Sequence, residues 1–310
     1  MFESDKSGIW VEKYRPNTLD TYVGNNHIKT KCQSWIDNGE IPHLLFQSKE
    51  PGTGKTTIAK ILANSVDSTL LYINASDENN VETVREKIKN FASTMAFTRW
   101  KIIILDEADY LTPNAQAALR NLMEEFAGHT RFILTCNYFE KVIEPLRSRC
   151  QVFHINPPSK QDVAIQLTKV LASESISFEI QDIATIVTAT YPDIRKAIGM
   201  CQQNSLGGTL RLDSATVMES NYVDKVIDLL ITTKKKSEGM NSIRQLIADS
   251  SVRDFTSLYR GLYDELEQYA TGHIAQCILI IAEAQASDAM VVDKEINVMA
   301  MVIKLLNEIK

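Results

Sequence analysis

Short apolar runs alternate with stretches of helical period through the first half of the chain. The runs occupy residues 43–48, 70–74, 101–105, 131–136 and 151–155, and polar or turn residues bound each of them. Between the runs, apolar residues recur every three to four positions, as in TTIAKILANSV and NAQAALRNLMEEF. Because short buried strands that alternate with helices form parallel sheets, the pattern predicts an α/β domain with helices on both faces of its sheet.

The pattern changes at NPPS, residues 156–159, after which helical periods follow and no strand is predicted. The chain is therefore expected to contain an α/β domain over 1–156, a small helical domain over 157–220 and a helical bundle over 221–310. The stretch TTKKKSEG, residues 232–239, is predicted to be an exposed loop.

Composition places the chain among ordinary globular proteins. It has 310 residues, of which 44% are hydrophobic and 23% charged, enough for two or three domains with cores of their own. The net charge of −6 argues against an overall basic surface but leaves room for a local basic stripe. Scattered cysteines, no apolar leader and no apolar run of about 20 residues predict a reducing, cytoplasmic location without disulfides, zinc or a membrane span.

The sequence EPGTGKTT, residues 50–57, follows the first predicted strand and opens a helix. Glycines let backbone N–H groups approach phosphates, a lysine reaches the β- and γ-phosphates, and a threonine hydroxyl suits Mg²⁺. The residues predicted to bind nucleotide phosphates are Gly52, Thr53, Gly54, Lys55, Thr56 and Thr57, with Thr56 on the metal. Lys49 stands where such loops usually begin with glycine, which predicts an altered loop entrance. The alternative is a plain turn before a helix.

Two acids, Asp106 and Glu107, end the apolar run of residues 102–105. Ligands of parallel sheets bind at strand C-termini, so Asp106 is placed to hold Mg²⁺ and Glu107 to polarise an attacking water. The letters DEAD also occur in RNA helicases, but that class needs two such domains, more than this chain holds beside its helical C-terminal half. A second alternative is a pair of purely structural carboxylates.

Two further residues are candidates near the γ-phosphate. Asn137 ends the fourth predicted strand and could bridge the phosphate and the attacking water, although asparagine at a strand end is more often a turn residue. Arg195 lies in the first turn of a helix that begins near Pro192. Because a helix N-terminus favours anions, this arginine predicts a negative group, such as a phosphate, in front of it.

These residues together resemble the AAA+ ATPases of sliding-clamp loaders. The segment WVEKYRPNTLDTYVGN (10–25) is similar to the adenine-binding segment of replication factor C small subunits. The likeness continues through NASDENNVETVREKI, LDEADYLTPNAQAALRNLMEE and EPLRSRC, over about residues 10–200. The loop QSKEPGTGKTT, the sequence NFAS (90–93) and the short C-terminal region resemble the ATPase subunit of T4-type bacteriophage clamp loaders.

The resemblance implies an AAA+ P-loop domain with a five-stranded parallel sheet, a helical lid and an all-α collar that joins subunits. It also implies an ATPase motor that uses ATP and Mg²⁺ to open a sliding clamp and bind primer–template DNA. DNA-stimulated hydrolysis then releases the closed clamp. The implied partners are the clamp, the DNA, other copies of the chain and one different subunit in a five-membered loader, in the cytoplasm of a host bacterium.

The resemblance further implies roles for residues at matching positions. Asn137 matches sensor 1, and Arg195 lies in the sensor 2 helix. Arg149 of the Ser-Arg-Cys motif would act in trans as an arginine finger in the neighbouring subunit's site, whereas Arg147 is expected to hold the strand end or a nearby carboxylate. The positions that would line the adenine and ribose are Val11, Glu12, Lys13, Tyr14, Arg15 and Val23.

Candidate DNA contacts lie at two helix starts, because helix N-termini bind phosphates without a large net charge. They are Asn79, Asn80, Arg85, Thr112 and Asn114, with ordinary helix capping as the alternative. Gln116 and Arg120 match positions that couple DNA contact to the catalytic carboxylate.

A candidate clamp contact follows the first of these helices. Val84, Ile88, Phe91 and Met95 have the spacing of a core stripe. Residues 93–98 are predicted to form a tip that contacts the clamp through Met95 and Phe97.

Two other functions stay open at this point. A helicase or branch-migration motor of the AAA+ class should carry a basic DNA-binding domain after the lid, whereas residues 219–310 contain 10 Lys/Arg and 14 Asp/Glu. A non-hydrolysing scaffold subunit of a loader would lack the loop lysine or the acidic pair, and both are present here.

Overall fold

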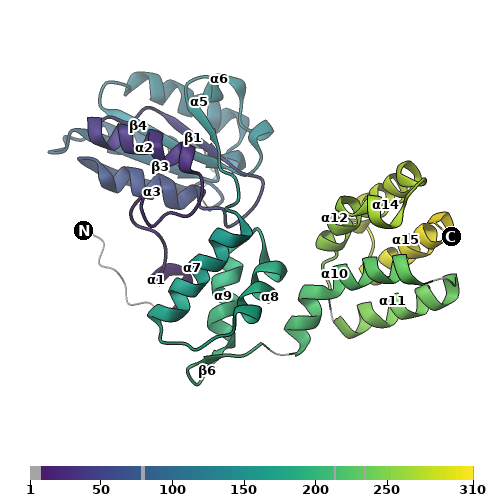
Figure 1. The fold of residues 1–310 in the computed structure, drawn as a ribbon. Coiled ribbons are helices and arrows are strands. Elements are labelled where there is room, and N and C mark those ends of the chain that lie inside the picture. Colours follow the sequence, from purple (N-terminus) through teal and green to yellow (C-terminus); the bar gives the residue numbers. More distant parts are fainter. Residues whose placement is uncertain (1–7, 78–80, 213, 234, 251, 310) are drawn as a thin grey trace. The chain divides into compact units, whose positions relative to one another are not determined.

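A computed structural model describes residues 8–77, 81–212, 214–233, 235–250 and 252–309, with backbone alone at residues 83 and 214–221. The chain forms two compact units (Figure 1). The first comprises Met1–Ser177 and Thr190–Gln203, and the second comprises Phe178–Ala189 and Asn204–Lys310. The division into three domains at residues 156 and 220 stays a prediction.

A five-stranded sheet forms the centre of the first unit, in the order β2-β3-β4-β1-β5. Every neighbouring pair is parallel, as the alternation of strands and helices predicts. Leu45 of β1, for example, pairs with Leu134 of β4 and Val152 of β5. The strands are β1 (Leu44–Gln47), β2 (Ser68–Asn74), β3 (Trp100–Asp106), β4 (Thr130–Cys136) and β5 (Gln151–His154).

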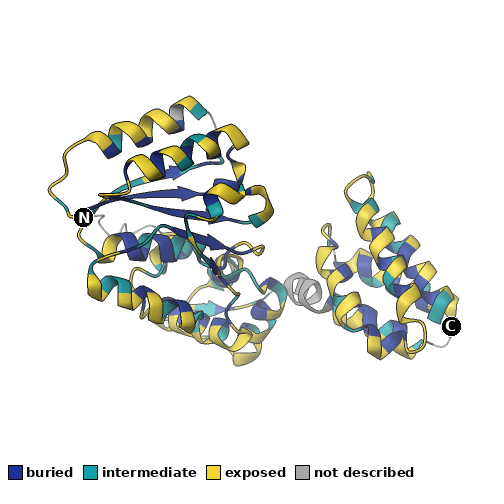
Figure 2. Cartoon of the chain, turned by 90° about the horizontal axis from the view of Figure 1, so that it is seen from above, coloured by how far each residue is buried: buried dark blue, intermediate teal, exposed yellow. Residues whose placement is uncertain are grey.

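Helices cover both faces of this sheet, and alternate residues of the central strand β3 enter two separate cores. Ile102 and Ile104 pack in a core with helices α2 (Asn26–Asn38) and α3 (Lys55–Ser65). Ile103 and Leu105 pack in the other core, with α4 (Val81–Ser93) and α5 (Pro113–Glu125). Figure 2 shows the buried strands between helices whose outer sides are exposed. Burial on both faces explains why the central strands β1, β3 and β4 are apolar runs without alternation.

Shorter elements complete the first unit. Helix α7 has an N-cap, because Ser159 Oγ accepts a hydrogen bond from the backbone N–H of Asp162 at 3.1 Å. The elements are α1 (Trp10–Lys13), η1 (Ala108–Tyr110), η2 (Phe139–Lys141), α6 (Glu144–Arg147), α7 (Lys160–Ser173) and α9 (Ile194–Asn204).

The second unit is mainly helical, and its C-terminal helices share one apolar core from Tyr222 to Leu306. Its elements are α8 (Ile180–Thr190), β6 (Ser205–Leu206), β7 (Thr209–Leu210), α10 (Ser214–Thr232), α11 (Lys236–Ser250), α12 (Thr256–Asp264), α13 (Leu266–Tyr269), α14 (Ile274–Asp288) and α15 (Lys294–Ile309). Among the described residues, no helix combines the length and apolarity that a membrane crossing requires.

Two expectations for this unit are wrong. A strand pair, β6 and β7, does follow residue 159, formed around Gly207 and Gly208, whose positive φ angles of 61° and 80° suit a two-residue hairpin turn. The stretch 232–239 is not simply a loop, because α11 begins at Lys236 and Gly239 is buried in it. Two-residue strands leave almost no apolar pattern, and a lysine run is compatible with the exposed face of a helix.

Candidate nucleotide-binding site

The predicted phosphate loop connects β1 to α3 and needs both of its glycines. Gly52 and Gly54 have φ angles of 70° and 97°. A Cβ atom on Gly52 would lie 2.0 Å from Asp193 Oδ1, and one on Gly54 would lie 2.8 Å from Tyr22 Cε2. Lys55 Nζ donates to the carbonyl oxygens of Ser48 and Glu50, each at 3.1 Å. Burial, with Arg195 nearby, lowers the pKa of Lys55.

Three hydroxyl groups surround the carboxylate of Asp106, which is itself buried. Thr56 Oγ1 lies 2.8 and 2.9 Å from the two carboxylate oxygens. Tyr72 donates to Oδ2 at 2.8 Å, and Thr135 donates to Oδ1 at 2.5 Å. A threonine hydroxyl and a carboxylate beside a phosphate loop are the hard oxygen donors that Mg²⁺ prefers. Thr56 and Asp106 therefore fit the ion, as the sequence predicts, although Tyr72 and Thr135 were not foreseen.

Glu107 occupies an uncommon backbone conformation. Its φ of 56° lies in the left-handed region, which non-glycine residues enter at a cost of about 1–3 kcal/mol. Its backbone N–H donates to Thr135 Oγ1 at 3.0 Å. Thr135 thus contacts both acidic residues. Its hydroxyl donates to the side chain of Asp106 and accepts from the backbone of Glu107. The backbone next to the predicted catalytic carboxylate is fixed from the neighbouring strand.

Asn137 directly follows β4. Its backbone N–H donates to Asp109 Oδ1 at 3.3 Å, and the N–H of Tyr138 donates to Oδ2 at 3.1 Å. Asp109, the last letter of DEAD, is buried. That acid serves as a structural acceptor and fixes the backbone of Asn137.

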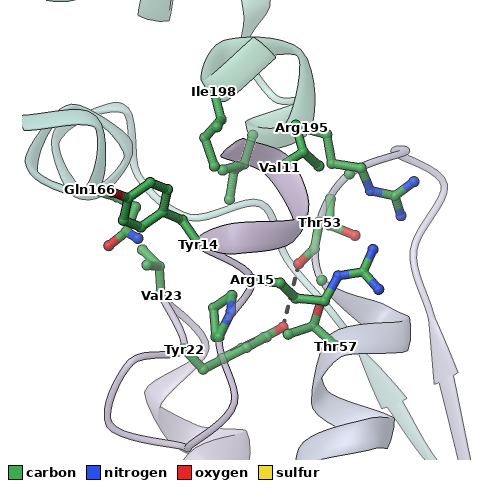
Figure 3. Close-up of a pocket in the computed structure, with 14 residues that line it drawn as sticks. Val11, Tyr14, Arg15, Tyr22, Val23, Thr53, Thr57, Gln166, Arg195 and Ile198 are labelled. Carbon is green, nitrogen blue, oxygen red and sulfur yellow. Dashed lines mark hydrogen bonds between the residues drawn. The ribbon is translucent and has the colours of Figure 1, made fainter. Parts of the chain in front are cut away.

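A pocket lies beside the phosphate loop and is lined mainly by apolar side chains (Figure 3). Four residues predicted for the adenine and ribose side line it: Val11, Tyr14, Arg15 and Val23. The pocket also includes residues that were not predicted, among them Pro16, Tyr22, Gln166, Ile194 and Ile198. Tyr22 donates to the carbonyl oxygen of Thr53 at 3.4 Å and so joins this pocket to the phosphate loop.

The other two residues predicted for this side do not line the pocket. Glu12 forms an ion pair with Arg15, whose Nη2 lies 2.9 Å from Glu12 Oε1. Lys13 forms an ion pair with Glu174 at the end of α7, at 2.5 Å. Glu12 therefore pairs with a residue of the pocket wall, whereas Lys13 pairs with a residue outside it.

Arg195 lines the pocket at the start of α9, and the anion in front of that helix is a side chain of the chain itself. Asp193 Oδ1 accepts hydrogen bonds from the N–H groups of Arg195 at 2.9 Å and Lys196 at 3.1 Å. Because Asp193 also lies against Gly52, the start of α9 meets the phosphate loop. The anion at this helix start is thus Asp193, which sequence reasoning did not identify, and a contact between Arg195 and a phosphate stays a prediction.

The two arginines of EPLRSRC have different surroundings. Arg147 forms an ion pair with Glu144 at 2.8 Å and stacks over the ring of Phe139 at 4.6 Å, which confirms its predicted structural role. Arg149 forms an ion pair with Glu124 of α5 and donates to the carbonyl oxygen of Pro145 at 2.7 Å. Arg149 is not among the residues that line the pocket. Its action in a neighbouring subunit stays a prediction.

Helix α5 carries the predicted coupling residues. Gln116 is buried, donates to the carbonyl oxygens of Leu111 and Lys141 at 3.0 Å each, and accepts from the N–H of Ile143 at 2.8 Å. Gln116 therefore joins the residue before the N-cap of α5 to η2 and to the start of α6. Arg120 Nε lies 3.7 Å from Glu124 Oε1.

The candidate DNA contacts differ in how much the structure tells about them. Thr112 caps α5, because its Oγ1 accepts from Ala115 N at 3.3 Å, as the capping alternative predicts. Asn114 and Arg85 are exposed. Asn79 and Asn80 lie outside the described residues.

The predicted clamp-contacting tip exposes two large apolar side chains, Met95 and Phe97. The core stripe is confirmed for Val84 and Ile88 but is wrong for Met95, because α4 ends at Ser93 and Met95 is fully exposed. Lys101 anchors the base of the tip. Its Nζ donates to the carbonyl oxygens of Phe91 and Ala92, each at 2.8 Å, and also to that of Thr94.

Sequence reasoning missed Tyr72, Thr135, Gln166 and Asp193. The only available signal concerned Thr135, which precedes Asn137 by two positions and would face the same side if the strand extended to Asn137 as predicted. The other three reach the site from other elements, and no local spacing indicates that they meet.

The five-stranded parallel sheet, the phosphate loop and the Asp106 carboxylate beside it define the class of the protein as an AAA+ ATPase. Residues 48–158 match the family model described as ATPase family associated with various cellular activities (AAA). The fold resembles the Thermotoga maritima RuvB Holliday junction branch migration motor, with a TM-score of 0.56 over 86% of this chain and 91% of that one. At 18% identity this likeness shows the fold alone.

Sequence relatives identify the family within that class. The chain is 37% identical to the replication factor C small subunit of Haloarcula marismortui over 80% of this chain and 74% of that protein. It is 41% identical to the one of Sulfolobus acidocaldarius, over 66% of this chain and 65% of that protein. It is 36% identical to the replication factor C small subunit of Natronomonas pharaonis, over 83% of this chain and 77% of that protein. The chain belongs to the replication factor C small subunit family.

Proposed function

We propose that this chain is the ATPase motor subunit of a sliding-clamp loader. The observation that carries the proposal is the grouping of Thr56, Asp106 and Glu107 beside a phosphate loop whose two glycines have positive φ angles. Membership of the replication factor C small subunit family supports the assignment to clamp loading rather than to another AAA+ task.

The chemistry of the proposed site is hydrolysis of ATP to ADP and phosphate. Thr56 and Asp106 would hold Mg²⁺, which would supply neutralisation of the charge on the phosphates when bound. Lys55 also faces the phosphates, whose oxygens would replace the two carbonyl oxygens that its ammonium group now contacts. Glu107 orients the attacking water and accepts its proton, while Asn137 and Arg195 stabilise the γ-phosphate.

A second subunit completes this site. Arg149 is held outside the pocket of its own chain, so we assign it to the neighbour's γ-phosphate in trans. Binding of ATP opens the clamp and engages primer–template DNA, and DNA-stimulated hydrolysis releases the closed clamp. The assembly has five members, with copies of this chain and one different subunit.

The surfaces for DNA and clamp are proposals of the same kind. Helix starts at Arg85, Thr112 and Asn114 face DNA phosphates, with Gln116 and Arg120 as the coupling residues. Met95 and Phe97 contact the clamp. The motif QSKEPGTGKTT supports a phage loader in a bacterial cytoplasm, whereas the relatives named above are archaeal.

The test is an ATPase assay on the assembled loader, with and without primed DNA and its clamp. A clamp loader should hydrolyse ATP faster when both are present. A branch-migration motor would respond to DNA but not to the clamp, and a scaffold subunit would not hydrolyse ATP at all. Either of those results contradicts the proposal.

A further inference from the structure

The N-terminal segment that walls the pocket is fastened to helices α7 and α9. At its end, Lys13 Nζ and Tyr14 Oη lie 2.5 and 2.7 Å from the same oxygen, Oε1 of Glu174. Glu174 is the C-cap residue of α7. Its two partners lower the pKa of Glu174, and the same contacts raise the pKa of Lys13, as expected for a formed ion pair.

A second fastening lies at the start of the segment. Gln202 of α9 accepts from the backbone N–H of Trp10 at 2.9 Å through Oε1, and its Nε2 donates to the carbonyl oxygen of Gly8. The amide of one side chain thus satisfies a donor and an acceptor of the segment's backbone. Trp10 is buried, and its ring meets the ring of Tyr14 edge-on at 6.5 Å, which links the two fastenings.

The pocket lies between these fastened parts and the phosphate loop. Val11 and Tyr14 contribute the wall from the segment, Gln166 comes from α7, and Ile194, Arg195 and Ile198 come from α9. Figure 3 shows Val11 near Ile198 and Arg195 of α9, Tyr14 near Gln166 of α7, and Thr57 farther from α9. Residues 10–14, although remote from α7 and α9 in sequence, are therefore joined to them on the side away from the phosphates.

We propose that Glu174 and Gln202 are positioning residues that hold the adenine-side wall on helices α7 and α9, so that this wall and Arg195 move as one body. The inference rests on the proposed ATP site and deepens it. A nucleotide that closes α9 onto its phosphate would then bring Val11 and Tyr14 onto its base in the same movement. Glu174 and Gln202 do not themselves touch the nucleotide, because neither lines the pocket.

The expected consequence is selective for the base. Loss of Glu174 removes a charge-assisted hydrogen bond and an ion pair from the wall but nothing from the phosphate loop. Glu174→Ala should weaken ADP and ATP alike, by about tenfold, because both carry the same adenosine. The affinity for inorganic tripolyphosphate with Mg²⁺ should stay the same.

Isothermal titration calorimetry on the full chain tests the proposal with ADP, ATP and tripolyphosphate. Glu174→Gln keeps an acceptor for the Tyr14 hydroxyl and should lose only about twofold. Gln202→Ala should behave like Glu174→Ala. Its neighbour on the same helix, Gln203, is exposed, so Gln203→Ala is the matched control and should bind all three ligands as the wild type does. In steady state, Glu174→Ala should raise KM for ATP and leave kcat unchanged.

Two outcomes would overturn the inference. In one, ADP binds Glu174→Ala and Gln202→Ala as tightly as the wild type. In the other, ADP and tripolyphosphate weaken together, which would indicate general damage to α7 and α9. If the wild type binds neither ADP nor ATP, the proposed ATP site itself fails, and that result is separate from both.

Discussion

Thr135 and Thr130 form a matched pair on one strand, and they test the account of the two acids. Both are buried in β4. Thr135 Oγ1 donates to Asp106 at 2.5 Å and accepts from the N–H of Glu107 at 3.0 Å. Thr130 Oγ1 has no hydrogen-bond partner among the described residues. Replacing each by valine keeps the shape and removes the hydroxyl alone.

The structure sets the expected magnitudes for this pair. Thr135→Val removes a hydrogen bond to a charged group, worth about 1.5–3 kcal/mol, and leaves the Glu107 N–H unsatisfied, so a destabilisation of about 2–4 kcal/mol is expected. For a unit of this size that is a fall of roughly 5–15 °C in Tm. Thr130→Val removes a buried hydroxyl without a partner and should be neutral or stabilising by about 1 kcal/mol.

Thermal unfolding and ATPase assays on the two variants check this reasoning. Thr135→Val should also lose kcat, because Glu107 loses the contact that fixes its left-handed backbone. Thr130→Val should keep wild-type turnover. Equal effects of the two substitutions on Tm, or wild-type kcat in Thr135→Val, would refute the role assigned to Thr135.

Four further predictions address the site and its surroundings. Glu107→Gln should bind ATP normally by calorimetry yet hydrolyse it at a small fraction of the wild-type rate, since the amide cannot accept the water's proton; wild-type turnover would exclude Glu107 as the base. Arginine fingers acting in trans contribute about 10³–10⁵ in rate. A mixture of Arg149→Ala and Lys55→Ala subunits should therefore regain ATPase activity at interfaces where an intact finger meets an intact loop. A mixture that assembles but stays inactive would contradict action in trans. Phe97→Ala should reduce the clamp's stimulation of the ATPase and leave nucleotide affinity unchanged, whereas an unaltered clamp response would remove Phe97 from that interface. Burial and the nearby Arg131 lower the pKa of His43 from 6.5 to about 4. Unfolding therefore takes up a proton in this range, and the free energy of unfolding should fall as pH falls from 6.5 to 4, more steeply than in His43→Gln; parallel curves would contradict the assignment.

The sequence predicted the sheet and its phosphate loop because both have local signatures. The central strands are buried on both faces and so appear as apolar runs, and the two loop glycines are required by positive φ angles. A glycine-lysine-threonine run after a strand has few other uses. These features depend on residues within one short stretch, which is what a single sequence displays.

The rest of the site depends on residues that are distant in sequence. Asp193 meets Gly52, and Glu174 meets Tyr14, across separations that no periodicity encodes. Tyr72 reaches Asp106 because the parallel register of β2 and β3 places Asn74 beside Asp106, so that a hydroxyl two positions earlier lies nearby. Met95 was misassigned for a local reason, since the helical period was extended beyond the last residue of α4.

Clamp transfer to DNA tests the central claim most directly. The assembled loader, its clamp and primed circular DNA are incubated with ATP, and clamps retained on the DNA are counted after gel filtration. We expect ATP-dependent retention on closed circles, loss of the clamps when the circle is linearised, and multiple rounds of loading that Glu107→Gln cannot complete. A loader that hydrolyses ATP yet leaves no clamp on the primed circle would contradict the proposed function.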